Sequence, residues 1–120
     1  MGEMREFTTG ATRNVDTGKN DYEGFLSPEV IEIFGNYMTK HRVQADGKIR
    51  ASDNWQRGIP KTAYMKSLWR HFLDMWFLHR GIPRTDAQTG ENLTMENVLC
   101  SILFNVQGYL FEVLQKRELK

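Results

Sequence analysis

The stretch Lys61-Thr-Ala-Tyr-Met-Lys-Ser-Leu-Trp-Arg-His-Phe-Leu-Asp-Met-Trp-Phe-Leu-His-Arg80 decides the fold class of this chain. Its apolar residues recur at three- and four-residue spacing, which is typical of one face of an α-helix. They are Met65, Leu68, Trp69, Phe72 and Trp76, with Leu73 and Phe77 widening the stripe. Pro60 suits a first helical position, and Gly81 followed by Pro83 is a stop signal. We therefore expect a helix at 61–80 in the middle of a helical bundle.

This helix also carries polar residues that a buried helix must pair. Lys66, Arg70 and Asp74 recur every fourth residue and form one ridge, and His71 lies three residues before Asp74. These side chains pair with one another, with residues on neighbouring elements, or with a ligand. The ridge is therefore the first candidate for a functional site.

Two further stretches have helical spacing. Ser-Pro-Glu at 27–29 supplies an N-cap, a proline at the first helical position and an acid in the first turn, and predicts a helix at 28–43. Thr94 caps a third helix, predicted at 95–116. The predicted inner faces are Val30, Ile33, Phe34, Tyr37 and Met38, and then Val98, Leu99, Ile102, Leu103, Val106, Leu110, Val113 and Leu114.

The remaining chain has no sustained period. Residues 1–26 are rich in turn residues and predict an extended N-terminal arm, followed by a single helical domain at 27–120. Alternating strand-like runs are absent. The predicted fold is therefore all-α, a small bundle of three main helices preceded by an arm.

Composition limits the class of function. The chain has 120 residues and a net charge of +1, and its basic residues are spread among acids, so we expect no general nucleic-acid binding. The longest uninterrupted apolar run, Met75–Leu78, is too short to span a bilayer, and the N-terminus lacks the apolar core of a secretory signal. Together with a single cysteine, Cys100, this predicts a cytoplasmic protein that does not enter a membrane.

The aromatic content is high for so short a chain. Three tryptophans and seven phenylalanines are more than three helices cover easily. We therefore expect a homo-oligomer.

Acidic residues suggest a metal site. Glu29 and Glu32 share one helix face, His71 and Asp74 share another, and Glu96 begins the third helix. Carboxylates from facing helices suit Mg²⁺ or Mn²⁺ bound with a phosphate-bearing substrate. The alternative is structural: the two glutamates form a solvated face, Asp74 pairs with Arg70, and His71 is a hydrogen-bonded core histidine.

A second polar row lies on the third predicted helix. Asn97, Ser101 and Asn105 are spaced every fourth residue, and Gly108 continues near the same row. A glycine inside a helix costs about 1 kcal/mol relative to alanine. Close approach of another helix or of a ligand would compensate.

Several stretches together resemble a known family. They are Gly10-Ala-Thr-Arg-Asn, Gly18-Lys-Asn-Asp-Tyr-Glu-Gly-Phe-Leu-Ser-Pro, Asp53-Asn-Trp-Gln-Arg-Gly-Ile-Pro, Ser67-Leu-Trp-Arg-His-Phe and Leu99-Cys-Ser-Ile-Leu-Phe-Asn-Val-Gln-Gly-Tyr-Leu. The chain resembles the small phage and prophage proteins of the dATP/dGTP diphosphohydrolase N-terminal family. More distantly, it is similar to the all-α, MazG-like nucleotide pyrophosphohydrolases. The resemblance implies Mg²⁺-dependent hydrolysis of purine dNTPs to dNMP and pyrophosphate, in the cytoplasm of a bacterial host.

The resemblance, together with the polar residues described above, indicates roles for particular residues. The catalytic candidates are His71, Asp74 and Arg70. The substrate-binding candidates are Lys19, Asp21, Tyr22, Asn54, Trp55, Lys66 and Asn105, with Trp55 or Tyr22 stacking on the purine. The metal candidates are Glu29, Glu32, Asp74 and Glu96, although His71 stands where the MazG-like second metal pair has a glutamate.

Two other classes of function stay open. A non-catalytic protein could bind or sequester a nucleotide, or a nucleotide-like signal, through Lys19, Arg70 and His71 with the same aromatic residues. Alternatively, the chain is an interaction protein whose aromatic residues form an oligomer interface.

Overall fold

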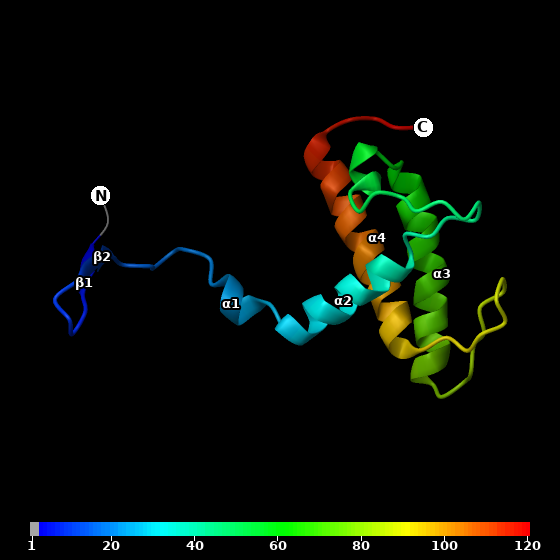
Figure 1. Ribbon diagram of the computed structural model, residues 1–120, viewed down its shortest axis with the longest axis horizontal. Coiled ribbons are helices and arrows are strands. Elements are labelled where there is room, and N and C mark those ends of the chain that lie inside the picture. The colour runs from blue at the N-terminus through cyan, green and yellow to red at the C-terminus, as the bar shows by residue number, and fades with distance from the viewer. Residues whose placement is uncertain (1–2) are drawn as a thin grey trace.

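Two long helices form the centre of the fold. The computed structural model describes residues 3–120. In it, α3 (Lys61–His79) and α4 (Met95–Gln115) run antiparallel, side by side (Figure 1). The C-terminal part of α2 (Pro28–Lys40) packs against α4. A single 3₁₀ turn, η1 (Asn54–Arg57), also contacts α4.

The three predicted helices are confirmed within a few residues. Ser27 and Thr94 cap α2 and α4 as predicted, through side-chain oxygens that accept the N–H groups of Val30 and Asn97. Pro60 lies just before the first residue of α3. Helix α2 ends at Lys40 and not at 43, because the chain from 41 onward turns into a loop closed by a β-bridge between Val43 and Ile49.

The N-terminal arm is more ordered than its sequence predicts. Strands β1 (Met4–Glu6) and β2 (Thr12–Asn14) form an antiparallel hairpin, and α1 (Tyr22–Phe25) is one helical turn. The predicted helical bundle is therefore confirmed in outline, and the arm adds one small sheet that the all-α prediction did not include. The strands are too short to show an alternating pattern, and a turn with Gly10 at φ 90° joins them.

The arm extends away from the helical body (Figure 1). The radius of gyration is 19.8 Å, whereas a compact chain of this length has a radius of about 14 Å. The principal extents are 62 × 38 × 27 Å. The chain therefore exposes much more surface than a compact monomer.

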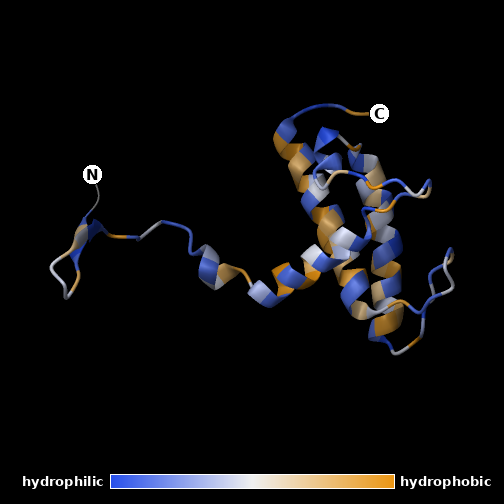
Figure 2. Cartoon of the chain, viewed as in Figure 1, coloured by the Kyte–Doolittle hydropathy of each residue, from blue (hydrophilic) through white to orange (hydrophobic). Residues whose placement is uncertain are grey.

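Buried apolar side chains are few. Among residues 3–120 they are Tyr64, Val98 and Cys100. The inward row of α4 is largely small or polar, comprising Val98, Ser101, Asn105, Gly108 and Glu112. The predicted apolar stripes of α3 and α4 are mostly solvent-exposed instead, and so are Val30 and Ile33 of α2. Hydrophobic residues, in orange, recur along all three long helices in Figure 2.

Gly108 permits the close contact between α3 and α4. A Cβ atom at this position would lie 2.3 Å from the Cε1 and Cζ atoms of Tyr64. The Tyr64 ring is 2% exposed, and its hydroxyl has no hydrogen-bond partner among residues 3–120. Close helix approach, one of the two compensations expected for this glycine, is therefore present.

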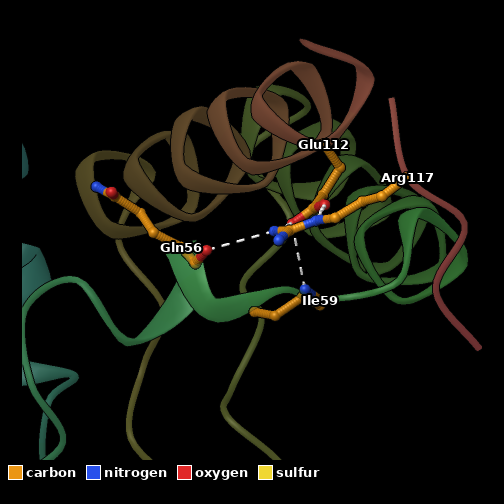
Figure 3. Close-up of polar contacts among 4 residues, drawn as sticks. All are labelled: Gln56, Ile59, Glu112 and Arg117. Carbon is orange, nitrogen blue, oxygen red and sulfur yellow. Dashed lines mark hydrogen bonds and ion pairs between the residues drawn. The ribbon is translucent and has the colours of Figure 1, made fainter. Parts of the chain in front are cut away.

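The C-terminal tail is fixed to α4 by an ion pair. Lys116 adopts a left-handed conformation, at φ 54° and ψ 41°, after which Arg117 donates to both carboxylate oxygens of Glu112 at 2.8 Å (Figure 3). The other contacts join this pair to the η1 segment. The Ile59 N–H donates to Glu112 at 3.3 Å, and Arg117 donates to the Gln56 carbonyl at 3.3 Å.

Helix α4 also has membrane-like composition. In the described part of the chain, it is the one helix long and apolar enough to cross a bilayer, with a third of its most apolar window (33%) buried. Counting uninterrupted apolar runs missed this, because Ser101, Asn105 and Gly108 divide the apolar residues of α4. Cytoplasmic location stays a prediction.

Substituting Gly108→Ala should lower the free energy of unfolding by about 1–3 kcal/mol, reduced by the gain of up to about 1 kcal/mol in helix propensity, because the added methyl overlaps Tyr64. The matched control is Gly35→Ala in α2, where a Cβ meets nothing within 4 Å. It should raise stability by about 0.5–1 kcal/mol. Urea titration of both variants measures this, and equal stability of the two would contradict the close contact.

Glu112 should make stability depend on acid pH. Hydrogen bonds from Arg117, assisted by the Ile59 N–H, lower the pKa of Glu112 below its usual 4.5. The stabilisation is therefore complete above pH 4.5 and is lost as pH falls through the folded-state pKa. We expect Glu112→Gln to be less stable than wild type at pH 7, with the difference shrinking in acid. Denaturant titrations from pH 7 to 3 test this. Glu118→Gln, on the exposed tail, controls for lost charge, and a difference that persists in acid would contradict the assignment.

Candidate functional site

A pocket lies on the face of the α3–α4 pair that α2 and the loop 41–59 cover. Its volume is about 680 Å³, within the range of small-molecule sites. Basic or imidazole groups (His41, Arg42, Arg50 and His71), aromatic rings (Tyr37, Trp55 and Phe104) and polar side chains (Asn54, Ser67, Gln88 and Asn105) all line it. No Asp or Glu lies in this lining among the described residues.

A hydrogen-bonded chain fixes one wall. The Tyr37 hydroxyl bonds Ser101, whose own hydroxyl donates to the Asn97 carbonyl at 3.1 Å, so Tyr37 must be the donor to Ser101. Burial raises the pKa of Tyr37, which keeps the phenol protonated. Asn105, 5% exposed, donates through Nδ2 to the Ser101 carbonyl at 2.7 Å. The wall is therefore rigid and held by side chains of α2 and α4.

His41 is oriented by the end of α2. Its ring stacks on Tyr37 with centroids 4.0 Å apart, and its Nδ1 lies 2.9 Å from the Tyr37 carbonyl. A carbonyl only accepts, so Nδ1 carries the proton in this contact. In the neutral ring, Nε2 is then free to accept, whereas a protonated ring offers a second donor.

Two arginines lie opposite each other in the loop. The β-bridge Val43–Ile49 pairs the two sides of the loop, and Arg42 donates through Nε to the Arg50 carbonyl at 2.9 Å. Within residues 3–120 neither guanidinium forms an ion pair with a carboxylate. Guanidinium groups without acid partners at a pocket are suited to a phosphate or carboxylate ligand.

His71 lines the same pocket, and its side chain is half-buried. Burial is the main cause that lowers the pKa of His71 below its usual 6.5; Arg70 and His41 lower it further, and Asp74 opposes them. The Asp74 carboxylate accepts from Arg84 Nε at 3.1 Å. In the structural alternative to a metal site, Asp74 pairs with Arg70, whereas in the structure its partner is Arg84. His71 is largely neutral near pH 7.

Trp55 is both a packing residue and a pocket residue. Its ring meets Phe111 and Phe104 edge to face, with centroids 4.9 and 6.2 Å apart. The side chain is half-buried and lines the pocket beside Phe104. The ring is therefore held in place by α4.

The structure brings together some of the predicted site residues. Asn54, Trp55, His71 and Asn105 line the one pocket. The exposed side chains of Lys66 and Arg70 are outside that lining, so the predicted polar ridge does not form its wall. The predicted arm residues, Lys19, Asp21 and Tyr22, also lie outside it. Asp21 caps α1 by accepting the Gly24 N–H, and Lys19 lines a small depression on the β1–β2 hairpin.

The predicted metal ligands are not assembled within one chain. Among residues 3–120 there is no group of three or more His, Cys, Asp or Glu side chains arranged to hold a metal ion. Glu29, Glu32 and Glu96 are exposed, and Asp74 is in its ion pair with Arg84. The acidic set expected for Mg²⁺ or Mn²⁺ is therefore not brought together within residues 3–120 of one chain, and metal binding stays a prediction.

Neither these two arginines nor His41 was named as a site residue from the sequence. Arg42 and Arg50 are eight residues apart in a polar loop, and no motif marks that spacing. The loop geometry comes from the Val43–Ile49 bridge and the turn at Gly47, with φ 83°. The Asp46-Gly47 turn was the one available signal, since it places its flanking residues on opposing sides of a loop.

No protein-family model matches this chain, and comparison with curated proteins and with solved structures gives no match.

The lowered pKa of His71 should be visible in stability. The unfolded chain binds a proton at His71 near its usual pKa of 6.5 while the folded chain does not, so the free energy of unfolding should fall as pH drops below 6.5. NMR titration of the three histidines gives the direct test, with His71→Gln identifying the resonance. A His71 that titrates at or above 6.5 would contradict its burial.

Proposed function

We propose that this protein binds a purine nucleotide, of the dATP or dGTP type, in the pocket between α2, the loop 41–59, α3 and α4. The observation that carries the proposal is the lining. Arg42, Arg50 and the two imidazoles meet three aromatic rings with no acid among them. A polyanion attached to a flat aromatic base satisfies both halves of such a pocket.

The phosphates belong beside the arginines. A guanidinium presents paired donors that match two phosphate oxygens, and each such charge-assisted bond contributes about 1.5–3 kcal/mol. His41 Nε2 becomes a further donor when its ring is protonated. Because the loop arginines lack acid partners within residues 3–120, phosphate binding breaks no existing ion pair.

The base belongs against the aromatic wall. Stacking of a base on an aromatic side chain contributes about 1–3 kcal/mol in single-stranded nucleic-acid complexes. Trp55 and Phe104 offer ring surface, and the amides of Asn54 and Asn105 offer donors and acceptors for a purine edge. The pocket volume of about 680 Å³ leaves room for both parts of the ligand.

Hydrolysis is the further step that the family resemblance implies, and it stays a prediction. The carboxylates that the resemblance assigns to Mg²⁺ lie outside the pocket lining. Binding without turnover is therefore the function that the geometry of a single chain supports best, and hydrolysis to monophosphate and pyrophosphate is an outcome to be measured alongside it.

Calorimetric titration with dATP, dGTP, dTTP and ATP, in EDTA and again in Mg²⁺, tests the proposal. We expect purine nucleotides to bind in EDTA, with affinity falling as salt is raised. Arg50→Gln should weaken binding about tenfold or more. This substitution leaves intact the backbone carbonyl that accepts from Arg42. Ion-exchange chromatography of the same samples reports any monophosphate and pyrophosphate.

The matched control is Lys48→Gln, which removes one positive charge from the same loop at a residue outside the pocket lining. It should bind like wild type. Equal weakening by both variants would reduce the effect to general charge, and no purine nucleotide binding in either buffer would overturn the proposal.

A further inference from the structure

Helix α4 exposes a regular apolar row. Leu99, Leu103, Val106, Leu110 and Val113 follow one another at spacings of four, three, four and three residues, and each is between 38% and 56% exposed. A 3.5-residue apolar repeat is the pattern of a helix that packs along another helix. Within this chain, the buried row of α4 is the other one, which contains Ser101, Asn105 and Gly108, and Gly108 meets Tyr64 of α3.

Helix α3 exposes a row of the same kind. Met65, Trp69, Phe72 and Trp76 are spaced four, three and four residues apart, and Trp69 is 67% exposed. The rows on α3 and α4 adjoin at one end, because a groove of about 660 Å³ is lined by Phe72 and Trp76 together with Met95 and Leu99. We call these two rows together the apolar seam.

The surface of the seam has grooves into which side chains of a facing helix can insert. Trp76 lines the groove shared with α4 and also a second apolar groove, shared with Leu73 and Phe77. The Trp76 ring, with a groove on each side, can insert between side chains of a facing helix, and the two grooves can receive side chains of that helix.

The seam lies away from the nucleotide pocket. Ser67 lines the pocket, whereas Trp76 lies in the seam, nine residues further along α3. At about 100° per residue, nine residues place them half a turn apart. A partner on the seam would therefore leave the pocket accessible.

The exposed area is large enough to supply a dimer interface. The described chain exposes 10075 Å², whereas a compact monomer of this mass exposes about 6,700 Å². The extended arm accounts for part of the excess. An obligate homodimer removes about 1,000–2,500 Å² from each chain, which the seam and the excess area can supply.

We propose that two copies of this chain pair seam to seam, so that the α3–α4 pairs of both copies form a four-helix bundle. A second copy is the occupant that the spacing favours, since a 3.5-residue repeat on both helices matches the same repeat on an identical face. A lipid surface requires only an apolar face and no such register. The proposal does not depend on the nucleotide.

Sedimentation velocity of the full chain over a hundredfold range of concentration is the first test. We expect a dimer, or a higher even-numbered assembly, at micromolar concentration, and a melting temperature that rises with concentration because dissociation accompanies unfolding. This measurement needs no variant. A stable monomer throughout would overturn the proposal.

Substitutions then locate the interface. Val106→Glu or Trp69→Glu places a charge in the seam and should shift the assembly to monomer. Ile49→Glu is the matched control, because Ile49 is an equally apolar and 66% exposed residue in the loop 41–59. Its assembly should be unchanged, and circular dichroism checks that each variant folds. An assembly that survives both seam substitutions, or that responds equally to Ile49→Glu, would overturn the seam as the interface.

Vesicle flotation tests whether a lipid surface, and not a second copy of the chain, covers the seam. Wild type is mixed with phosphatidylcholine–phosphatidylglycerol vesicles and centrifuged. We expect the assembled protein to stay in solution. Flotation that Val106→Glu abolishes would identify a lipid surface as the occupant and overturn pairing of two copies.

Discussion

The structure depends on how closely α3 approaches α4, and that distance is set where the Tyr64 ring lies over Gly108. No other residue type leaves room for the ring there. The inward row of α4 is short-chained around this point, with Ser101 and Asn105 joined by hydrogen bonds to Tyr37 and to the helix backbone. The polar network therefore joins α4 to α2, the Tyr64–Gly108 contact joins α4 to α3, and many large apolar residues of both long helices stay exposed.

This arrangement explains which parts of the fold the sequence predicts well. Helix positions follow from apolar spacing, caps and stop signals, which are local properties, and Ser27 and Thr94 act as those signals indicate. Orientation of each helix is not local. Two rows on α4 repeat at nearly the same spacing. Hydrophobicity predicts that the row with Leu103 and Leu110 faces inward, whereas steric fit to Tyr64 places the row with Gly108 inward. The β1–β2 hairpin escaped prediction because three-residue strands carry too little pattern.

The residues of the candidate site also divide into those that the sequence predicts and those that it does not. Asn54, Trp55, His71 and Asn105 were predicted from their chemistry and from the family resemblance, and the fold brings them to one pocket. Arg42 and Arg50 needed a loop whose closure depends on a single β-bridge. The partner of Asp74 was not predicted for another reason: Arg84, beyond the end of α3, reaches it, whereas the structural alternative considered only Arg70 within the helix. Side-chain pairing across connections is not visible in helical spacing.

The tail that follows α4 has a consequence for the pocket, which lies well before it in sequence. Arg117 contacts Glu112 and the Gln56 carbonyl, and Gln56 follows Trp55 directly. The last residues therefore brace the segment that holds the indole ring in place. Loss of these residues, for example by protease trimming of the tail, would remove the contacts that hold Gln56 beside Trp55. Purification through the N-terminal arm leaves this brace untouched.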